Sequence, residues 1–348
     1  RCRTAVPGHR LSDLGRAVSQ TVASRDRVAM NRLRYFEDRL PGHSVATVGT
    51  FDGVHLAHQA LLRTMDVLAR AASLSRVVFY FPVPPRYRTR PQGQLLTLPE
   101  ERERLLEMAG VDVVVPLPLP EILKVTPEQF LDDLRERFGV QHLVMGFNHR
   151  FGRARSADPA WICAHIEAHP LTLHVLPPFR VGTHVVSSET VRTLLRDGDV
   201  ETAARLLGRP YRLQGTVVPG DGRGRRLGFP TANLTLPPLR LRPRAGVYGV
   251  RVHLGGRTEA GVAHLGHRPT FAAEEPVLEV HLLGFAGGEL YGQTLEVEML
   301  FRLRNVQRFP DAEALRLAIQ ADIAAARARF QEPLPGNRKP SESDTTAP

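Results

Sequence analysis

Apolar positions between residues 43 and 208 follow two alternating periods. Short runs of small and β-branched residues, bounded by glycine or proline, predict buried strands over 44–49, 76–81, 111–117, 141–145 and 171–176. Apolar residues at helical spacing predict helices over 57–72, 97–110, 126–138, 159–168, 188–196 and 200–207. Two of these helices open with capping-box patterns, at Thr97–Glu100 and Thr126–Gln129. The alternation predicts an α/β domain with a doubly wound parallel sheet and helices on both faces.

The pattern changes after residue 210. Short apolar or alternating segments occupy 211–218, 247–253, 259–263, 277–285 and 295–303, and turns of Gly, Pro and Asp separate them. Several strands with no helix between them predict a small antiparallel β-barrel. The stretch 311–330 is amphipathic and predicts one terminal helix that packs on the barrel.

Length and pattern together predict two domains. A chain of 348 residues exceeds the usual size of one domain, and the change of period places the joint near 208–211. We therefore expect an N-terminal extension at 1–42, the α/β domain at 43–208 and the barrel domain at 209–330. Residues 331–348 are rich in Pro, Ser, Asp and Thr, which predicts a disordered tail.

Composition narrows the range of partners. The net charge of +10 comes mostly from arginine and favours anionic ligands. These ligands could be nucleic acid, an acidic membrane or phosphorylated small molecules, but the basic residues are spread along the chain without interleaved aromatics, which favours an ordinary solvated surface over nucleic-acid binding. No apolar run is long enough to cross a membrane. The two cysteines, Cys2 and Cys163, are isolated and fit neither a disulfide framework nor a zinc site, so we expect a cytoplasmic protein.

The first candidate site lies where a predicted strand becomes a helix. The segment Gly49–His58 reads GTFDGVHLAH, and its two histidines, His55 and His58, fall in the first helical turn. A helix N-terminus supplies unpaired N–H donors and a favourable dipole for an anion, and each imidazole can donate to a phosphate oxygen. Taken alone, His-x-x-His is more often a helix start with two surface histidines. Its place directly behind a strand favours a phosphate site.

The second candidate site is a glycine-rich loop at 220–233. Gly222, Gly224 and Gly228 alternate with arginines that include Arg225. Glycines let backbone N–H groups close around phosphate, and arginines add charge-assisted hydrogen bonds. The spacing matches neither a dinucleotide fingerprint nor a Walker loop. By itself, such a loop is equally compatible with a flexible turn.

Three polar residues strengthen the phosphate interpretation. Thr231 and Asn233 stand two residues apart, so an extended backbone places both oxygens on one face, where they can bind Mg²⁺. Glu279 interrupts an apolar strand, and a buried acid needs a partner or a function. The plain alternatives are an ordinary strand after a proline turn and an outward-facing glutamate.

The first half resembles the FMN adenylyltransferase module of bacterial bifunctional riboflavin kinase/FAD synthetases, a nucleotidylyltransferase-like domain, through GTFDGVHLAHQ, GFNHRFG and SSETVR. The resemblance implies that His55 and His58 bind the ATP phosphates and stabilise the transition state. It further implies contacts with flavin at Asn148 and with ATP at Gly49, Phe51, Asp52, Ser187, Ser188 and Arg192.

This half departs from the family pattern at four positions. Ala57 replaces the glycine between the histidines, and Val83 replaces the histidine of the family's Pro-His-Pro. Glu189 stands in place of a threonine, and His149 in place of a phenylalanine.

The second half resembles riboflavin kinase from Leu207 to the last helix. The resemblance implies that Thr231 and Asn233 bind Mg·ATP and that Gly222, Gly224, Arg225 and Gly228 contact its phosphates. It also implies that Glu279 is the general base that deprotonates the riboflavin 5′-hydroxyl. The family's asparagine before Gly-x-Arg-Pro-Thr is His264 here, and an aspartate before Phe285 is Gly284.

The residues leave three functions open. The first is a transferase that uses Mg²⁺ and ATP to convert riboflavin to FMN in the C-terminal domain and FMN to FAD, with release of pyrophosphate, in the N-terminal domain. The alternative is a riboflavin kinase whose N-terminal domain is degenerate and has a structural or regulatory role. A non-catalytic flavin-responsive or nucleic-acid-binding protein is disfavoured, because Thr231, Asn233 and Glu279 are all present.

Overall fold

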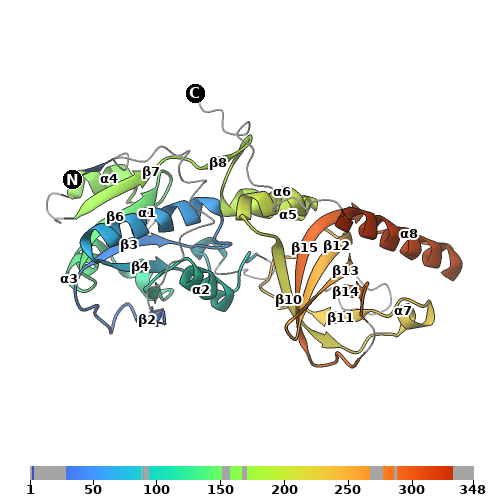
Figure 1. Ribbon diagram of the computed structural model, residues 1–348. Coiled ribbons are helices and arrows are strands. Elements are labelled where there is room, and N and C mark those ends of the chain that lie inside the picture. Colours follow the sequence, from blue (N-terminus) through green and yellow to red (C-terminus); the bar gives the residue numbers. More distant parts are fainter. Residues whose placement is uncertain are drawn as a thin grey trace. The chain divides into compact units, whose positions relative to one another are not determined.

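A computed structural model of the chain describes residues 2–3, 29–87, 89, 94–150, 157–166, 171–266, 277–285 and 288–331 (Figure 1). Most of the predicted N-terminal extension and nearly all of the predicted tail lie outside these residues. The chain forms two compact units. Among the described residues, the first unit holds those up to 89 and 97–186, and the second holds 94–96 and 187–331.

The first unit is built on a parallel sheet. Its strand order is β1-β7-β6-β3-β4-β5-β2, and every neighbouring pair is parallel, as predicted for a doubly wound domain. The strands are β1 (Cys2–Arg3), β2 (Asn31–Arg32), β3 (Ser44–Gly49), β4 (Ser75–Tyr80), β5 (Val113–Pro116), β6 (Val140–Gly146) and β7 (Thr172–Leu176). A two-stranded hairpin, β8 (Arg180–Val181) with β9 (His184–Val185), follows the sheet.

Helices cover both faces of this sheet because alternate strand residues point to opposite sides. On one face, Met65 and Leu106 pack with Val45 and Val78. On the other face, a second core contains Phe79 together with residues of helices α3 and α4. The helices are α1 (Leu56–Ala72), α2 (Pro99–Met108), α3 (Pro127–Glu136) and α4 (Pro159–His165), with 3₁₀ turns η2 (Pro85–Tyr87) and η3 (Glu121–Lys124).

Helix caps agree with the sequence at one of two predicted positions. Thr126 caps α3, where its hydroxyl accepts from the Gln129 N–H at 3.2 Å and the Gln129 side chain accepts from the Thr126 N–H at 3.0 Å. At α2 the prediction is one residue early. The Glu101 carboxylate accepts from the Leu98 N–H at 2.9 Å, and the Thr97 side chain is left for other contacts.

Part of the predicted extension packs on the first unit. Tyr35 is buried in the core, stacks on Phe130 with ring centroids 5.8 Å apart, and donates its hydroxyl to Asp133 at 2.7 Å. Burial, together with that hydrogen bond, raises the pKa of Tyr35.

Cys163 on α4 is disulfide-bonded, so the prediction of isolated cysteines is wrong at this residue.

The second unit is a closed antiparallel barrel with the strand order β10-β11-β14-β13-β12-β15, as the change of period predicts. Its strands are β10 (Tyr211–Val218), β11 (Ala232–Thr235), β12 (Gly246–Leu254), β13 (Arg257–Gly266), β14 (Val277–Leu282) and β15 (Thr294–Arg304). A one-turn helix, α7 (Arg223–Arg226), precedes β11. Helices α5 (Ser188–Asp197) and α6 (Val200–Leu207) also belong to this unit, and α6 packs on β10 and β15.

The terminal helix α8 (Ala312–Gln331) packs on the outside of the barrel, as predicted. Ala326 is fully buried in a cluster with Val247 and Val262. Arg304 of β15 donates twice to the Asp322 carboxylate of α8, at 2.7 Å each. Apolar contact and ion pairing therefore hold α8 against strands β12, β13 and β15 of the barrel.

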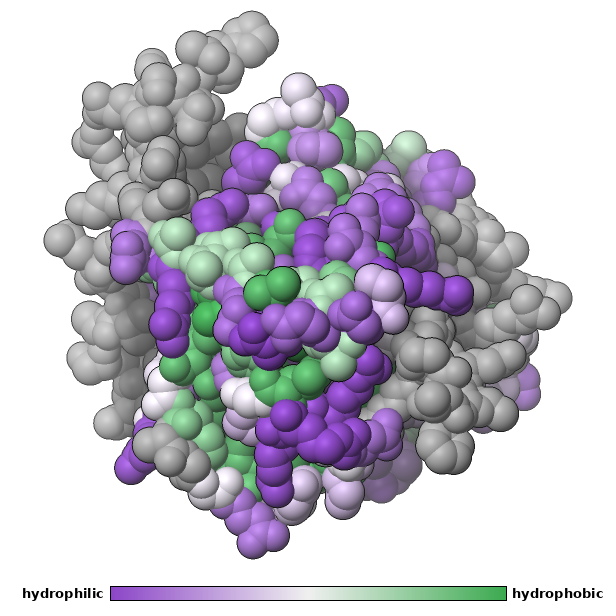
Figure 2. Space-filling view, turned by 90° about the vertical axis from the view of Figure 1, so that its right-hand side faces the viewer, coloured by the Kyte–Doolittle hydropathy of each residue, from purple (hydrophilic) through white to green (hydrophobic). Residues whose placement is uncertain are grey.

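No helix of the described chain is long and apolar enough to cross a membrane. Seen from the side where α7 and α8 lie in Figure 1, hydrophobic side chains form patches among hydrophilic ones (Figure 2).

Candidate active sites

The loop after β3 has an unusual backbone. Phe51, Gly53 and Val54 have φ angles of +50°, +86° and +39°. Positive φ is sterically unfavourable for residues with a Cβ, at about 1–3 kcal/mol each, and such residues cluster at functional sites. Phe51 and Val54 are nonetheless buried, at 1% and 2% exposure. The surrounding structure therefore holds this loop in a single strained shape.

The two predicted histidines meet at the start of α1. His55 is the N-cap residue, and its Nδ1 accepts from the His58 N–H at 3.3 Å. The two rings stack with centroids 3.6 Å apart and planes 14° apart, and His58 also lies against Phe51. An accepting Nδ1 is unprotonated, so a neutral His55 carries its proton on Nε2. The arrangement offers an Nε2–H donor beside a helix N-terminus, which suits a phosphate oxygen.

Asp52 lies beneath this loop rather than on its surface. Its side chain is fully buried, and its carboxylate accepts from the Thr97 N–H at 3.0 Å and from the Thr97 hydroxyl at 3.2 Å. Gly49 packs closely on Phe51, since a Cβ there would lie 3.0 Å from the Phe51 ring. The ATP contacts of Gly49, Phe51 and Asp52 stay predictions.

The other predicted residues of the first half are in two places. Asn148 is exposed in the turn after β6, where the His149 N–H bonds to the Gly146 carbonyl at 3.1 Å. The end of the predicted flavin loop, at 151–152, lies outside the described residues. Ala57 is the second residue of α1 and is partly exposed. A flavin contact at Asn148 stays a prediction.

Ser187, Ser188 and Arg192 lie in the second unit, at the start of α5. Ser187 is the N-cap, and its hydroxyl accepts from the Thr190 N–H at 3.1 Å. Arg192 is fully buried, donates to the Gln94 carbonyl at 2.8 Å, and pairs with Glu189 at 3.3 Å. The family departure at Glu189 is thus an ion-pair partner of Arg192. An ATP contact for these residues stays a prediction.

The barrel brings the second set of predicted residues together on its outer face. Glu279 of β14 is paired directly with Asn233 of β11 on one side and with His264 of β13 on the other. Directly paired residues on antiparallel strands have adjacent side chains, about 4.5–5.5 Å apart at Cβ. The intervening residues Leu278 and Val280 are buried, so Glu279 points away from the barrel interior. Burial lowers the pKa of His264, which favours a neutral ring beside the carboxylate.

Two glycines make room for the predicted metal ligands. A Cβ at Gly220 would lie 2.2 Å from the Asn233 amide nitrogen. A Cβ at Gly224 would lie 2.4 Å from the Phe229 carbonyl and 3.1 Å from the Thr231 hydroxyl. Asn233 and Thr231 thus sit in a cradle that only glycine permits. A hydroxyl and an amide oxygen are hard donors, so the residues present fit Mg²⁺.

The glycine-rich loop contains a helical turn that the sequence pattern does not predict. Gly222 is the N-cap of α7, with φ +65°, and Gly228 follows the C-cap residue, with φ +87°. The three arginines of α7, including Arg225, are exposed, and the Arg226 guanidinium donates to the Asp221 carbonyl at 3.0 Å. The loop therefore presents exposed positive charge close in sequence to the two predicted metal ligands, Thr231 and Asn233.

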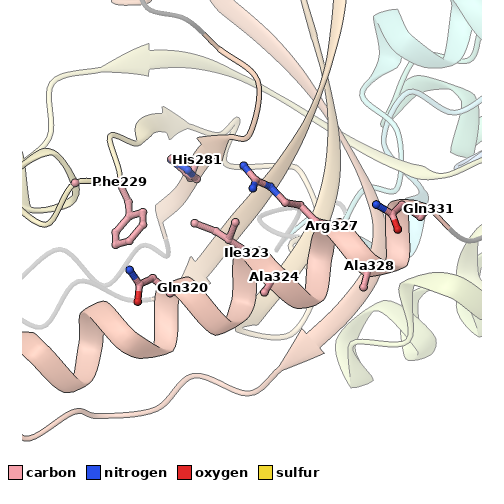
Figure 3. Close-up of a pocket in the computed structure, with 9 residues that line it drawn as sticks. Phe229, His281, Gln320, Ile323, Ala324, Arg327, Ala328 and Gln331 are labelled. Carbon is pink, nitrogen blue, oxygen red and sulfur yellow. The ribbon is translucent and has the colours of Figure 1, made fainter.

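A groove of about 660 Å³ runs between this loop and α8 (Figure 3). Phe229 and His281 line one wall, and α8 residues from Gln320 to Gln331 line the other. His281 is fixed by a 2.8 Å contact between its Nδ1 and the Pro230 carbonyl, and by edge contact with Phe229. The groove offers the Phe229 ring and aliphatic side chains of α8, which suit a planar aromatic ligand. Its His281 is two residues from Glu279 on β14, so both side chains lie on the same face of that strand.

Both halves of the chain match known protein families. A family model for riboflavin kinase matches residues 207–330, and one for FAD synthetase matches residues 38–190. The bifunctional riboflavin kinase/FMN adenylyltransferase of Pseudomonas fluorescens is 38% identical over 305 residues, which cover 86% of this chain and 97% of that protein. The chain belongs to the bifunctional riboflavin kinase/FMN adenylyltransferase family.

Further relatives support this family assignment. The family member of Escherichia coli K12 is 36% identical over 82% of this chain and 92% of its own length. That of Bacillus subtilis is 32% identical over 80% and 90%. A crystal structure from Streptococcus pneumoniae, described as a macrolide-efflux protein, has a TM-score of 0.77 at 29% identity and covers 86% of this chain and 99% of its own.

Sequence reasoning missed several residues that shape these sites. Phe229, His281 and one side of α8 line the groove, yet in the sequence they are ordinary loop, strand and helix positions. Arg102 is fully buried on the inner side of α2 together with Leu106. The one available signal is a charged residue on the apolar stripe of a helix. That signal is weak, because long arginine side chains often reach solvent from such positions.

Proposed function

We propose that the chain carries out two successive transfers on flavins. The second unit phosphorylates riboflavin to FMN with Mg·ATP, and the first unit adenylylates FMN to FAD with release of pyrophosphate. The observation that carries the first reaction is the cross-strand pair Asn233–Glu279 beside the glycine cradle that holds Thr231. The family assignment supplies flavin and ATP as the substrates.

In the kinase site, Glu279 is the general base. Its carboxylate takes the proton of the riboflavin 5′-hydroxyl as that oxygen attacks the γ-phosphorus and ADP leaves, which contributes about 10²–10⁴-fold to the rate. Thr231 and Asn233 would hold Mg²⁺, which when bound offsets the negative charge of the phosphates. The backbone of 222–228 and Arg225 hold the phosphate oxygens, and the groove along α8 holds the isoalloxazine ring.

In the adenylyltransferase site, the strained loop and the start of α1 receive the ATP phosphates. His55 and His58 donate hydrogen bonds to oxygens whose charge grows in the transition state, an effect of about 2.7–4 kcal/mol for one such donor in other enzymes. Asn148 is our candidate for contact with the flavin, and Ser187, Ser188 and Arg192 are our candidates for ATP. A cytoplasmic location is part of the same proposal.

Chromatography of purified protein with riboflavin and Mg·ATP tests this proposal. Successive appearance of FMN and FAD is the expected result. FMN without FAD would support the kinase with a degenerate first domain, for which Ala57, Val83 and Glu189 are the motivating departures. Absence of both products would contradict the proposal for both units.

A further inference from the structure

The guanidinium of Arg102 is buried completely inside the first unit. Its five N–H groups have acceptors: the carbonyls of Phe81 at 2.8 Å, Pro82 at 3.2 Å and Thr97 at 3.0 Å, the Thr97 hydroxyl at 3.3 Å, and the Asp52 carboxylate at 3.3 Å. The Asp52 side chain is also fully buried, so both ends of this ion pair are shielded from solvent. An arginine whose donors are all used has none left for a substrate.

These acceptors come from three segments that are separate in sequence. Asp52 belongs to the strained loop after β3, and Phe81 and Pro82 follow β4 directly. Thr97 immediately precedes the cap of α2. Because β3 and β4 are parallel neighbours, their two following loops leave the same edge of the sheet. Arg102 therefore ties both loops at that edge to the start of α2.

Thr97 completes the connection. Its hydroxyl donates to Asp52 at 3.2 Å and accepts from the Gly53 N–H at 3.0 Å as well as from Arg102. Gly53 lies between the two strained residues Phe51 and Val54, and His55 follows directly as the cap of α1. The buried network thus hydrogen-bonds to the centre of the strained loop, which ends at His55, the first predicted phosphate-binding histidine.

We propose that Arg102, acting through Asp52 and Thr97, is a positioning residue for adenylyl transfer: it holds the strained loop and the loop after β4 in the arrangement that receives ATP. The proposal rests on the proposed adenylyltransferase function of the first unit. It gives Asp52 a place beneath the site, in support of His55, instead of a direct contact with nucleotide.

Arg102→Lys tests this proposal because it keeps the charge and removes the fork that reaches three segments. We expect kcat of FMN adenylylation to fall about 10- to 100-fold, as for a misplaced reacting group, with a smaller change in KM for ATP. The kinase reaction of the same preparation should keep its wild-type rate. Hydrogen exchange should also become faster at the amides of residues 51–55.

Arg76→Lys is the matched control. Arg76 also forks onto carboxylates, Asp112 at 2.8 and 2.9 Å and Asp66 at 2.8 Å, but at the opposite end of β4. It should change the melting temperature without slowing adenylylation or exposing residues 51–55. If Arg102→Lys matches this control in both kcat and exchange, the proposal is wrong.

Thr97→Val decides the question if Arg102→Lys does not fold. It keeps the side-chain volume and removes the hydroxyl that bonds to Gly53, Asp52 and Arg102. We expect a lower kcat and faster exchange at 51–55 in a protein that melts cooperatively, and a folded variant with wild-type values of both would overturn the proposal. A wild-type protein that makes no FAD would contradict the proposed function instead, and the exchange comparison would still test the network.

Discussion

The two candidate phosphate sites reach similar chemistry from opposite structural starting points. In the first unit, the loop after β3 is buried, strained and supported from below by Asp52, Thr97 and Arg102, and a helix of 17 residues begins at its end. In the second unit, the loop around α7 is mostly exposed and rich in glycine, and it leads into β11, whose pairing with β14 places Asn233 beside Glu279.

This difference in architecture determines which feature of each unit supplies hydrogen-bond donors for a phosphate. In the parallel sheet, the loop after β3 leads directly into a helix, and the N-terminus of that helix supplies N–H donors for a phosphate. A loop of fixed shape is then enough to complete the site. In the described part of the barrel, the helix before β11 is the single turn α7, so we expect the donors to come from glycine backbone and arginine side chains, while strand register fixes the position of Glu279. We therefore expect the first site to fail when its support is loosened and the second when its glycine cradle is filled.

The largest effect is expected for Glu279→Gln. Removal of the proposed general base should slow FMN formation by about 10²–10⁴-fold, while conversion of added FMN to FAD continues. Glu259→Gln, a half-buried glutamate on the neighbouring strand β13, is the control and should leave both rates unchanged. Equal loss of both reactions in Glu279→Gln would contradict the assignment of one reaction to each unit.

Gly220→Ala should have the next largest effect. Its methyl group would meet the Asn233 amide at 2.2 Å, so we expect roughly a tenfold loss of kinase kcat/KM and about 1–3 kcal/mol of destabilisation. Gly284→Ala meets only the flexible end of Glu259 and should leave the kinase rate unchanged. The rates of FMN formation and urea unfolding curves would measure both effects. Similar behaviour of the two variants would show that the cradle is not needed.

Ala57→Gly should have a moderate effect in the other direction. Glycine is the family residue between the two histidines, so we expect adenylylation to rise a few-fold. The first turn of α1 should become less stable by at most about 1 kcal/mol, because glycine is a poor helix former. Initial rates of FAD formation from FMN test this, and an unchanged rate would show that the methyl group is tolerated.

The smallest effect concerns His264. Burial lowers its pKa in the folded state, so protonation favours unfolding, and its neutral form is compatible with folding above its ordinary pKa of about 6.5. The charged groups around it are Glu279, Arg304 and Asp322. Stability should fall as the pH drops below that value, and less steeply in His264→Asn. Urea unfolding of both proteins at pH 7.5 and 5.5 gives the change in the free energy of unfolding with pH. An equal change in the two proteins would show that His264 does not contribute to it.

Most of the fold follows from sequence pattern because its determinants are local. The period of apolar residues predicts, to within a few residues, the five central strands of the sheet, most strands of the barrel and the described α-helices other than α7. The two-residue strands β1, β2, β8 and β9 are missed. The short strand β11 and the turn α7 are missed, because glycine, proline and arginine carry no periodic signal. The capping box at Thr97 is misread because tertiary contacts with Asp52 and Arg102 outweigh the local pattern.

The candidate sites divide in the same way. His55 and His58 are one helical turn apart, so their meeting is a local consequence of sequence. The pairing of Asn233 with Glu279 depends on the register between β11 and β14, 46 residues apart, which no local pattern specifies. The burial of Arg102 depends on three distant segments at once and is visible only in the folded chain.

Complementation between two inactive variants tests the central claim of two independent sites most directly. Given riboflavin and Mg·ATP, His58→Ala should stop at FMN, and Glu279→Gln should make little of either product. A mixture of the two should form FAD, because FMN released by one variant is adenylylated by the other. A mixture that makes FMN but no FAD, although Glu279→Gln converts added FMN to FAD, would contradict independent sites.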